Sequence, residues 1–164
     1  MLMRQLSSDL RSAASISTTY PTSGSCAAGG SFAGPSYAGY GSCIALTILR
    51  PDAGVGTTCP RTEVTYGIAS GTLYTDRTEY VVSGASCVPG RTATKRALST
   101  SIVNDASHPF FAYYDRSGAD MLTASPAEAP KDAVSIRVTV QKRYRLREGD
   151  VLTFSNAVAL RNKR

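Results

Sequence analysis

The strongest constraint on the fold is residues 134–141, in which apolar and polar side chains alternate strictly. Alternation places the two sets on opposite faces of a β-strand, and the apolar set must be buried. A second alternating stretch, 64–68, is followed by a turn and further apolar residues, which predicts a β-hairpin. A last strand is predicted within 151–160, where the apolar side chains share one face; they are Leu152, Phe154, Val158 and Leu160. Strands joined by short turns predict an antiparallel sheet.

The first fifteen residues have a different period. Leu2, Leu6 and Leu10 recur every four residues, and polar or charged residues fill most positions between them. This spacing predicts an amphipathic α-helix over 1–15 whose apolar stripe packs on the sheet. Because no N-cap residue precedes it, the helix is expected to be the remainder of a longer one. The predicted fold class is therefore α+β, with an N-terminal amphipathic helix packed on an antiparallel β-sheet.

The chain has 164 residues and a mass of 17.3 kDa, which predicts a single globular domain. Residues 17–42 are rich in Gly and Ser and have no apolar period, so a long loop is expected there. Residues 43–161 are expected to form the antiparallel sheet. Within it, a further loop is predicted at 123–133. Long loops in a compact domain are usually functional or clamped.

The four cysteines predict disulfide bonds that would clamp these loops. The chain has a single His and no C-x-x-C pair, which disfavours a structural zinc site. Cys26–Cys43 and Cys59–Cys87 are the preferred pairs because each closes a loop with little apolar surface, although four cysteines allow three pairings. Disulfides imply an oxidising, extracytoplasmic compartment. The alternative is four buried, reduced thiols in a cytosolic protein.

The formal net charge of +6 is concentrated at one end of the chain. Residues 137–164 hold eight Lys/Arg against Glu148 and Asp150, whereas charges balance in the rest. Cations around one aromatic ring would attract a phosphate backbone and stack an unpaired base, giving sequence-independent nucleic-acid or polyanion binding. The alternative is a solvated hairpin whose charges protect its edge from aggregation. The candidate binding residues are Arg137, Lys142, Arg143, Tyr144, Arg145 and Arg147.

The sequence contains no recognisable catalytic or cofactor motif. His108 is the only histidine, and there is neither a G-x-S-x-G elbow nor a Gly-rich phosphate loop. Asp115 and Asp120 flank a Gly-containing turn, for which an ordinary β-turn is preferred over a calcium site. We therefore expect no enzyme, metal or cofactor, and a secreted hydrolase using His108 as its base is the enzymatic alternative. No apolar run is long enough to span a bilayer.

Several segments, taken in their order along the chain, resemble segments of type IV pilin-like proteins, especially J-type pseudopilins and W-type minor pilins. Residues 3–13 contain the L-x-x-D-L-R-x-A pattern that in this family follows the membrane-spanning half of the long helix. The hairpin at 64–77 is similar to the V-x-Y and L-x-R pattern of the family. Segments 109–115, 134–140 and 154–162 are similar to the ending of Gram-positive and related minor pilins. Together these segments cover about half of the chain. The resemblance also implies that 17–42, 51–62 and 81–97 are the loops in which members of the family differ.

The resemblance implies a non-enzymatic filament subunit. It would be made as a prepilin, held in the cytoplasmic membrane by an N-terminal segment absent from this sequence, and assembled with other pilins through its helix. The assembly would be a cell-surface type IV pilus (fimbrium) or a type II secretion pseudopilus. The subunit would prime assembly or present a tip surface for adhesion or DNA uptake, with the basic hairpin as the DNA contact. A secreted or surface nucleic-acid or polyanion binding module is the alternative.

Overall fold

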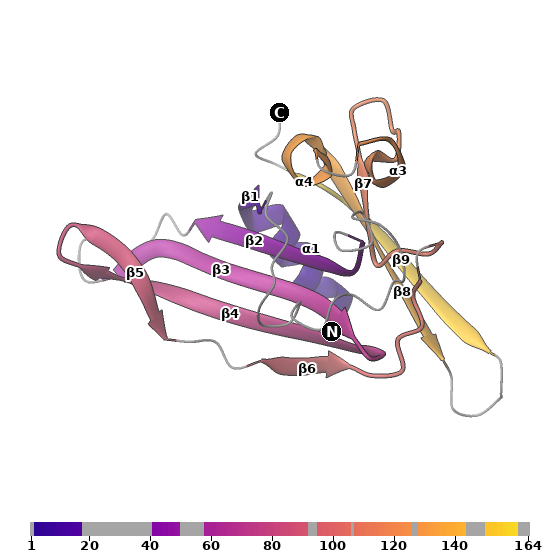
Figure 1. The fold of residues 1–164 in the computed structure, drawn as a ribbon, viewed down its shortest axis with the longest axis horizontal. Helices are drawn as coiled ribbons and strands as arrows, with labels where there is room; N and C mark the ends of the chain where they lie inside the picture. Colours follow the sequence, from indigo (N-terminus) through magenta and orange to yellow (C-terminus); the bar gives the residue numbers. More distant parts are fainter. Residues whose placement is uncertain are drawn as a thin grey trace.

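A computed structural model describes residues 2–17, 41–49, 58–91, 95–105, 107–125, 128–143 and 150–160 (Figure 1). The fold is α+β, and antiparallel β-structure dominates it. The elements in chain order are α1 (Leu2–Ser12), β1 (Ala13–Ile16), β2 (Cys43–Leu49), β3 (Thr58–Ala69), β4 (Thr72–Ser83), β5 (Ser86–Arg91), β6 (Arg96–Ser99), β7 (Phe111–Tyr114), α3 (Met121–Ala124), α4 (Ala129–Asp132), β8 (Ser135–Arg143) and β9 (Val151–Ala159).

The first sheet contains six strands, five of them in the order β1-β2-β3-β4-β5. The sixth strand, β6, pairs with the first part of β4, and β5 pairs with its last part, both opposite β3. The hairpin predicted from the alternation at 64–68 is confirmed, and it turns at Ser70 and Gly71, both with positive φ. A positive φ at both central residues suits the right-handed twist of the flanking strands.

The second sheet contains three strands in the order β7-β8-β9. Beyond β7, the same edge of β8 is continued by residues 101–103, where Ile102 forms a bridge to Lys142. The prediction of one sheet over 43–161 is therefore wrong, although the pairing is antiparallel throughout. Strands β1–β6 pair among themselves and β7–β9 pair with one another, so the strands of this region divide between two sheets.

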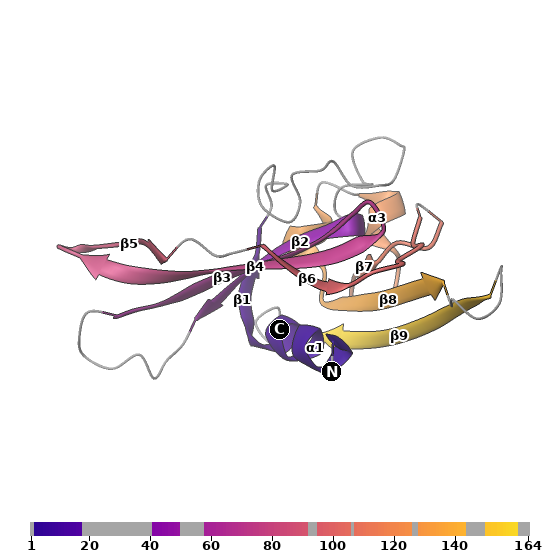
Figure 2. The same ribbon diagram turned by 90° about the horizontal axis from the view of Figure 1, so that it is seen from below.

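Helix α1 lies against β2 and β9 and buries Leu6 and Leu10 completely (Figure 2). The helix is shorter than predicted, because residues 13–16 form β1 instead of its last turn. This strand pairs antiparallel with β2, and Ala13 and Ile16 are buried there. The strand-to-strand hydrogen bonds thus outweigh the helical period of the local sequence. The apolar face of β8 belongs to the same core as α1, but the contacts of the helix are with β2 and β9.

Several segments expected to be loops are regular structure. Residues 58–62 belong to β3, and much of 81–97 belongs to the end of β4, to β5 and to β6. The residues of β5 are exposed, so the strand has no apolar period by which the sequence could show it. The stretch 123–133 includes the end of α3 and all of α4. Of the loop predicted over 17–42, the central part lies outside the described residues.

The core lies between the two sheets and α1. Its largest fully buried side chains come from all three layers, which ties the fold into one body. They include Leu6 and Leu10 of α1, Ile44, Leu46, Val64, Tyr66 and Leu73 of the first sheet, and Phe111, Tyr113, Ile136 and Val138 of the second.

Candidate functional site

The described residues contain no cluster that resembles a catalytic or metal site. No group of three or more His, Cys, Asp or Glu comes together within them. His108 is exposed, and its Nδ1 lies 3.2 Å from Oδ1 of Asp105. Slight burial of Asp105 raises its pKa, but hydrogen bonds from His108 outweigh this and hold the pKa below its usual value. This pair is an exposed loop contact.

The carboxylate of Asp115 organises the turn after β7. Its Oδ1 accepts hydrogen bonds from the backbone N–H and the hydroxyl of Ser117 and from the N–H of Ala119, at 2.7–3.0 Å. These bonds lower the pKa of Asp115. The Asp120 carboxylate accepts from the N–H of Leu122 and caps α3. Both carboxylates therefore serve local backbone groups, as expected of an ordinary turn.

The structure separates the described members of the predicted polyanion site. Arg137 and Arg143 lie on one face of β8, six positions and therefore about 20 Å apart. Arg137 is placed over the ring of Tyr114, with its guanidinium carbon 4.8 Å from the ring centroid. Lys142 is on the opposite face, where its Nζ lies 3.3 Å from the hydroxyl of Ser99. Tyr144, Arg145 and Arg147 lie outside the described residues, and polyanion binding stays a prediction.

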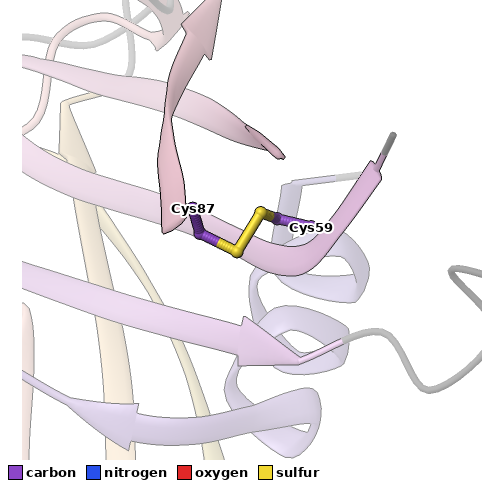
Figure 3. The surroundings of a disulfide bond; sticks show 2 residues. All are labelled: Cys59 and Cys87. Carbon is purple, nitrogen blue, oxygen red and sulfur yellow. A yellow bond between two sulfur atoms is a disulfide. The ribbon is translucent and has the colours of Figure 1, made fainter. Parts of the chain in front are cut away.

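A disulfide bond joins Cys59 at the start of β3 to Cys87 in β5 (Figure 3). It is one of the two pairings preferred from the sequence. Cys43 is also disulfide-bonded, and the predicted pairing with Cys26 falls outside the described residues. A disulfide is consistent with an extracytoplasmic location, because thiols are kept reduced in the cytosol.

The Cys59–Cys87 bond anchors a β-arm made by residues 79–91 of β4 and β5, which extends from the sheet at the end remote from β8 and β9 (Figure 1). Val81, Val82 and Val88 are exposed on this arm. At its base, Arg61 forms an ion pair with Glu63 and lies over the ring of Tyr80. Sequence reasoning missed the arm because turn residues and exposed side chains concealed its strands.

Helix α1 is held on the body by two polar contacts in addition to its leucines. The hydroxyl of Tyr66 donates to Oδ2 of Asp9 at 2.6 Å. Nδ2 of Asn156 in β9 donates to the hydroxyl of the buried Ser7 at 2.9 Å. The outward face of the helix is polar and leaves Arg4, Gln5, Ser8 and Arg11 exposed.

The first half of β9 carries exposed apolar side chains, which we call the β9 patch: Leu152 and Phe154 on one face of the strand and Val151 on the other. Leu152 and Phe154 share a face with Val158, as predicted, because they oppose Lys142 and Val140 in the β8–β9 register. Only Val158 and Leu160 are buried, however. Helix α1 lies beside the C-terminal end of β9, and the first half of the strand extends beyond the helix (Figure 2).

These elements define a fold dominated by antiparallel sheet with one N-terminal helix. Neither protein-family models nor curated proteins give a match to this sequence. Among solved structures, the chain is similar to one from the GspK-GspI-GspJ complex of the enterotoxigenic Escherichia coli type 2 secretion system. The TM-score is 0.55 at 13% sequence identity, and the match covers 98% of this chain and 93% of that one. The likeness therefore extends over the whole fold.

No helix within the described ranges is long and apolar enough to cross a membrane. The described surface also carries the polar face of α1, the exposed β-arm and the β9 patch. The strongest sequence signal for the last of these was a strand without a single charged residue.

Proposed function

We propose that this chain is a non-enzymatic structural subunit of an extracytoplasmic, pilin-like assembly, either a type IV pilus or a type II secretion pseudopilus. The observation that carries the proposal is the fold likeness to a chain of the GspK-GspI-GspJ complex, which extends over nearly all of both chains. The pilin-like sequence pattern in residues 3–13 supports it as well, and all of this pattern except Ala13 lies in α1. The Cys59–Cys87 disulfide fits the compartment.

In this proposal the partners are other subunits, which approach the outward face of α1. The inward face is engaged by the core, where Leu6 and Leu10 are buried. The outward face carries polar side chains and two arginines, so contact with another subunit there would be polar. The subunit would prime filament assembly, or it would present a binding surface at a filament tip. A membrane segment would precede α1.

Site-specific photo-crosslinking in the host cell tests the proposal. A photoreactive amino acid replaces Ser8 on the exposed face of α1, and Arg116 in the exposed turn after β7 serves as the matched control. We expect crosslinks from position 8 to other subunits in the membrane or filament fraction, and few from position 116. If position 8 gives no crosslinks and the protein is released as a free monomer, the proposal is wrong.

A deletion strain separates the two modes of action. Priming predicts that filaments or secretion are lost and return when the gene is restored. Display at a tip predicts that filaments form in normal number but no longer adhere or take up DNA. If the strain retains assembly, secretion, adhesion and DNA uptake, both modes are contradicted.

A further inference from the structure

The outward face of α1 carries two arginines that lie on one line along the helix. Arg4 and Arg11 are seven positions apart, which in an α-helix places them on the same side at a separation of about 10 Å. Ser8 lies between them, and all three side chains are exposed. We call these three residues the α1 stripe. Leu6 and Leu10, on the opposite side, are buried, so the α1 stripe faces away from the core.

Neither arginine of the α1 stripe makes a hydrogen bond or an ion pair within the described part of the chain. Asp9 is the one acidic residue of α1, and its Oδ2 accepts the hydrogen bond from the Tyr66 hydroxyl. The strands that α1 contacts most, β2 and β9, contain no charged residue. The local charge at the α1 stripe is therefore positive, and the elements beneath it do not offset it.

The two positive charges disfavour a second copy of this helix as the partner. If two copies of the α1 stripe met in parallel, Arg4 would face Arg4 and Arg11 would face Arg11. In an antiparallel pair, each Arg4 would face an Arg11. Both arrangements place like charges in contact, which is unfavourable. The complementary occupant is a segment of a different polypeptide that carries two carboxylates.

A nucleic acid or an anionic lipid surface matches the α1 stripe less well. The affinity for a phosphate polymer rises with the number of phosphates that the protein neutralises, and the α1 stripe offers only two cations. The exposed side chains of α1 include no aromatic ring on which a base could stack. Anionic lipid surfaces bind clusters of about four to eight cations. Two discrete carboxylates are therefore the better match.

The distance between the arginines favours a helical partner. An Arg guanidinium binds a carboxylate through two parallel N–H···O bonds, so each arginine takes one acidic side chain. In a helix, two acidic residues seven positions apart repeat the separation of about 10 Å on one face. In a strand, side chains on one face are about 7 or 13 Å apart. A helix with two acidic residues thus fits the α1 stripe directly.

We propose that the α1 stripe binds a helix of a different subunit through two Arg–carboxylate pairs. The partner helix carries two Asp or Glu residues seven positions apart, and it lies along α1 so that one of them pairs with Arg4 and the other with Arg11. Ser8 lies at the centre of the contact. This inference rests on the proposed function, in which other subunits approach the outward face of α1, and it states which subunits are able to do so.

Charge reversal combined with crosslinking from position 8 tests the proposal in the host cell. The test variant is Arg4→Glu with Arg11→Glu. The control is Arg96→Glu with Arg116→Glu, which makes the same change of charge at two exposed arginines outside α1. We expect the yield of crosslinked product to fall at least about fivefold in the test variant and to stay unchanged in the control. An unchanged yield in the test variant, or equal losses in both, would overturn the proposal.

A neutral variant keeps the test valid if charge reversal prevents folding. Arg4→Gln with Arg11→Gln removes both charges and retains side chains of high helix propensity. Thermal unfolding of each purified variant shows whether it folds. Where the charge-reversed variant does not fold, the neutral variant takes its place, and we expect it also to lower the crosslinking yield. An unchanged yield would then overturn the proposal.

The crosslinked partner provides a reciprocal test. Mass spectrometry of the crosslinked product identifies the partner segment, in which we expect two acidic residues seven positions apart. Replacing both of these residues with Arg should restore the yield with the charge-reversed variant and lower it with the wild type. A partner segment without such a pair, or a swap that does not restore the yield, would overturn the proposal. Crosslinks to a second copy of this chain alone would also overturn it.

Binding experiments with the purified chain examine phosphate groups as the alternative. The probes are a fluorescein-labelled single-stranded oligonucleotide and vesicles that contain phosphatidylglycerol. We expect neither probe to distinguish the test variant from the control. Binding of either probe that is lost in the test variant and kept in the control would assign the α1 stripe to phosphate groups and overturn the proposal.

The crosslinking experiment separates failure of this inference from failure of the proposed function. Crosslinks from position 8 to other subunits that persist at full yield in the charge-reversed variant would leave the proposed function intact and remove only the Arg–carboxylate pairs. If the wild type gives no crosslinks from position 8 and is released as a free monomer, the proposed function itself is wrong, and this inference is overturned with it.

Discussion

The hydrogen bond between Tyr66 and Asp9 makes the sharpest stability prediction. Tyr66 is fully buried in β3, and its hydroxyl donates to the Asp9 carboxylate of α1 at 2.6 Å across 57 residues of sequence. Tyr66→Phe keeps the ring and removes the donor, so the carboxylate loses a partner in a partly buried position. Hydrogen bonds to charged groups contribute about 1.5–3 kcal/mol.

We therefore expect Tyr66→Phe to lower the free energy of unfolding by about 2 kcal/mol. For a domain of this size this corresponds to a decrease in Tm of about 4–8 °C. Guanidinium and thermal denaturation measure both quantities. Tyr80→Phe is the matched control, because the Tyr80 hydroxyl also bonds to a carboxylate, that of Glu63, at the more exposed base of the β-arm. Its expected effect is within about 0.5 kcal/mol.

The same contact predicts a pH dependence. Burial, followed by the hydrogen bond to Asp9, raises the pKa of Tyr66 far above its usual value. In the unfolded chain the pKa of the Tyr66 phenol is about 10. The stabilisation is therefore complete below that pH and is lost as the pH rises above it, so the difference between wild type and Tyr66→Phe should narrow. A difference below about 0.5 kcal/mol at neutral pH would refute the reasoning.

Three further substitutions test other parts of the fold. Replacing Cys59 and Cys87 together by Ser should cost about 3–4 kcal/mol in chemical denaturation, since the bond spans 28 residues; a cost under about 1 kcal/mol would contradict this. Gly71→Ala should destabilise the protein more than Gly84→Ala in thermal unfolding. Both glycines have a positive φ, at which alanine costs about 1 kcal/mol or more, but only at Gly71 does the added Cβ come close to a backbone oxygen, at 3.2 Å. Equal losses of stability in the two variants would refute this. Asn104→Ala removes three hydrogen bonds from a buried side chain and should cost about 2–3 kcal/mol; hydrogen exchange along β8 should accelerate, and unchanged exchange would disprove the role.

The spacing of apolar residues along the chain predicted the elements that bury one face. The 64–68 alternation became part of the β3–β4 hairpin, and the 134–141 alternation became most of β8. The spacing of apolar residues gave the wrong prediction where pairing with another strand determined the structure. Residues 13–16 continue a helical pattern but form β1, because the edge of β2 is available to them. Strand β5 has no buried face and is held by pairing to β4 and by a disulfide.

The sequence indicated which residue types the candidate surfaces contain, but not how those residues are arranged or exposed. The excess of positive charge in 137–164 was evident, but the period of two along β8 places Arg137 and Lys142 on opposite faces. The shared face of Leu152 and Phe154 was also evident. Their exposure was not, because it depends on where α1 lies along β9.

The sequence by itself determined which residues alternate, which turn, and where charge and cysteines accumulate, because these properties depend on neighbours within a few positions. Only the tertiary structure decided how the described strands divide into two sheets, where the helix ends and which strands lie at the sheet edges. Those outcomes depend on competition between distant segments for the same strand edges and the same apolar face. Among the described residues, the pairing of β9 with β8 alone is one result of that competition.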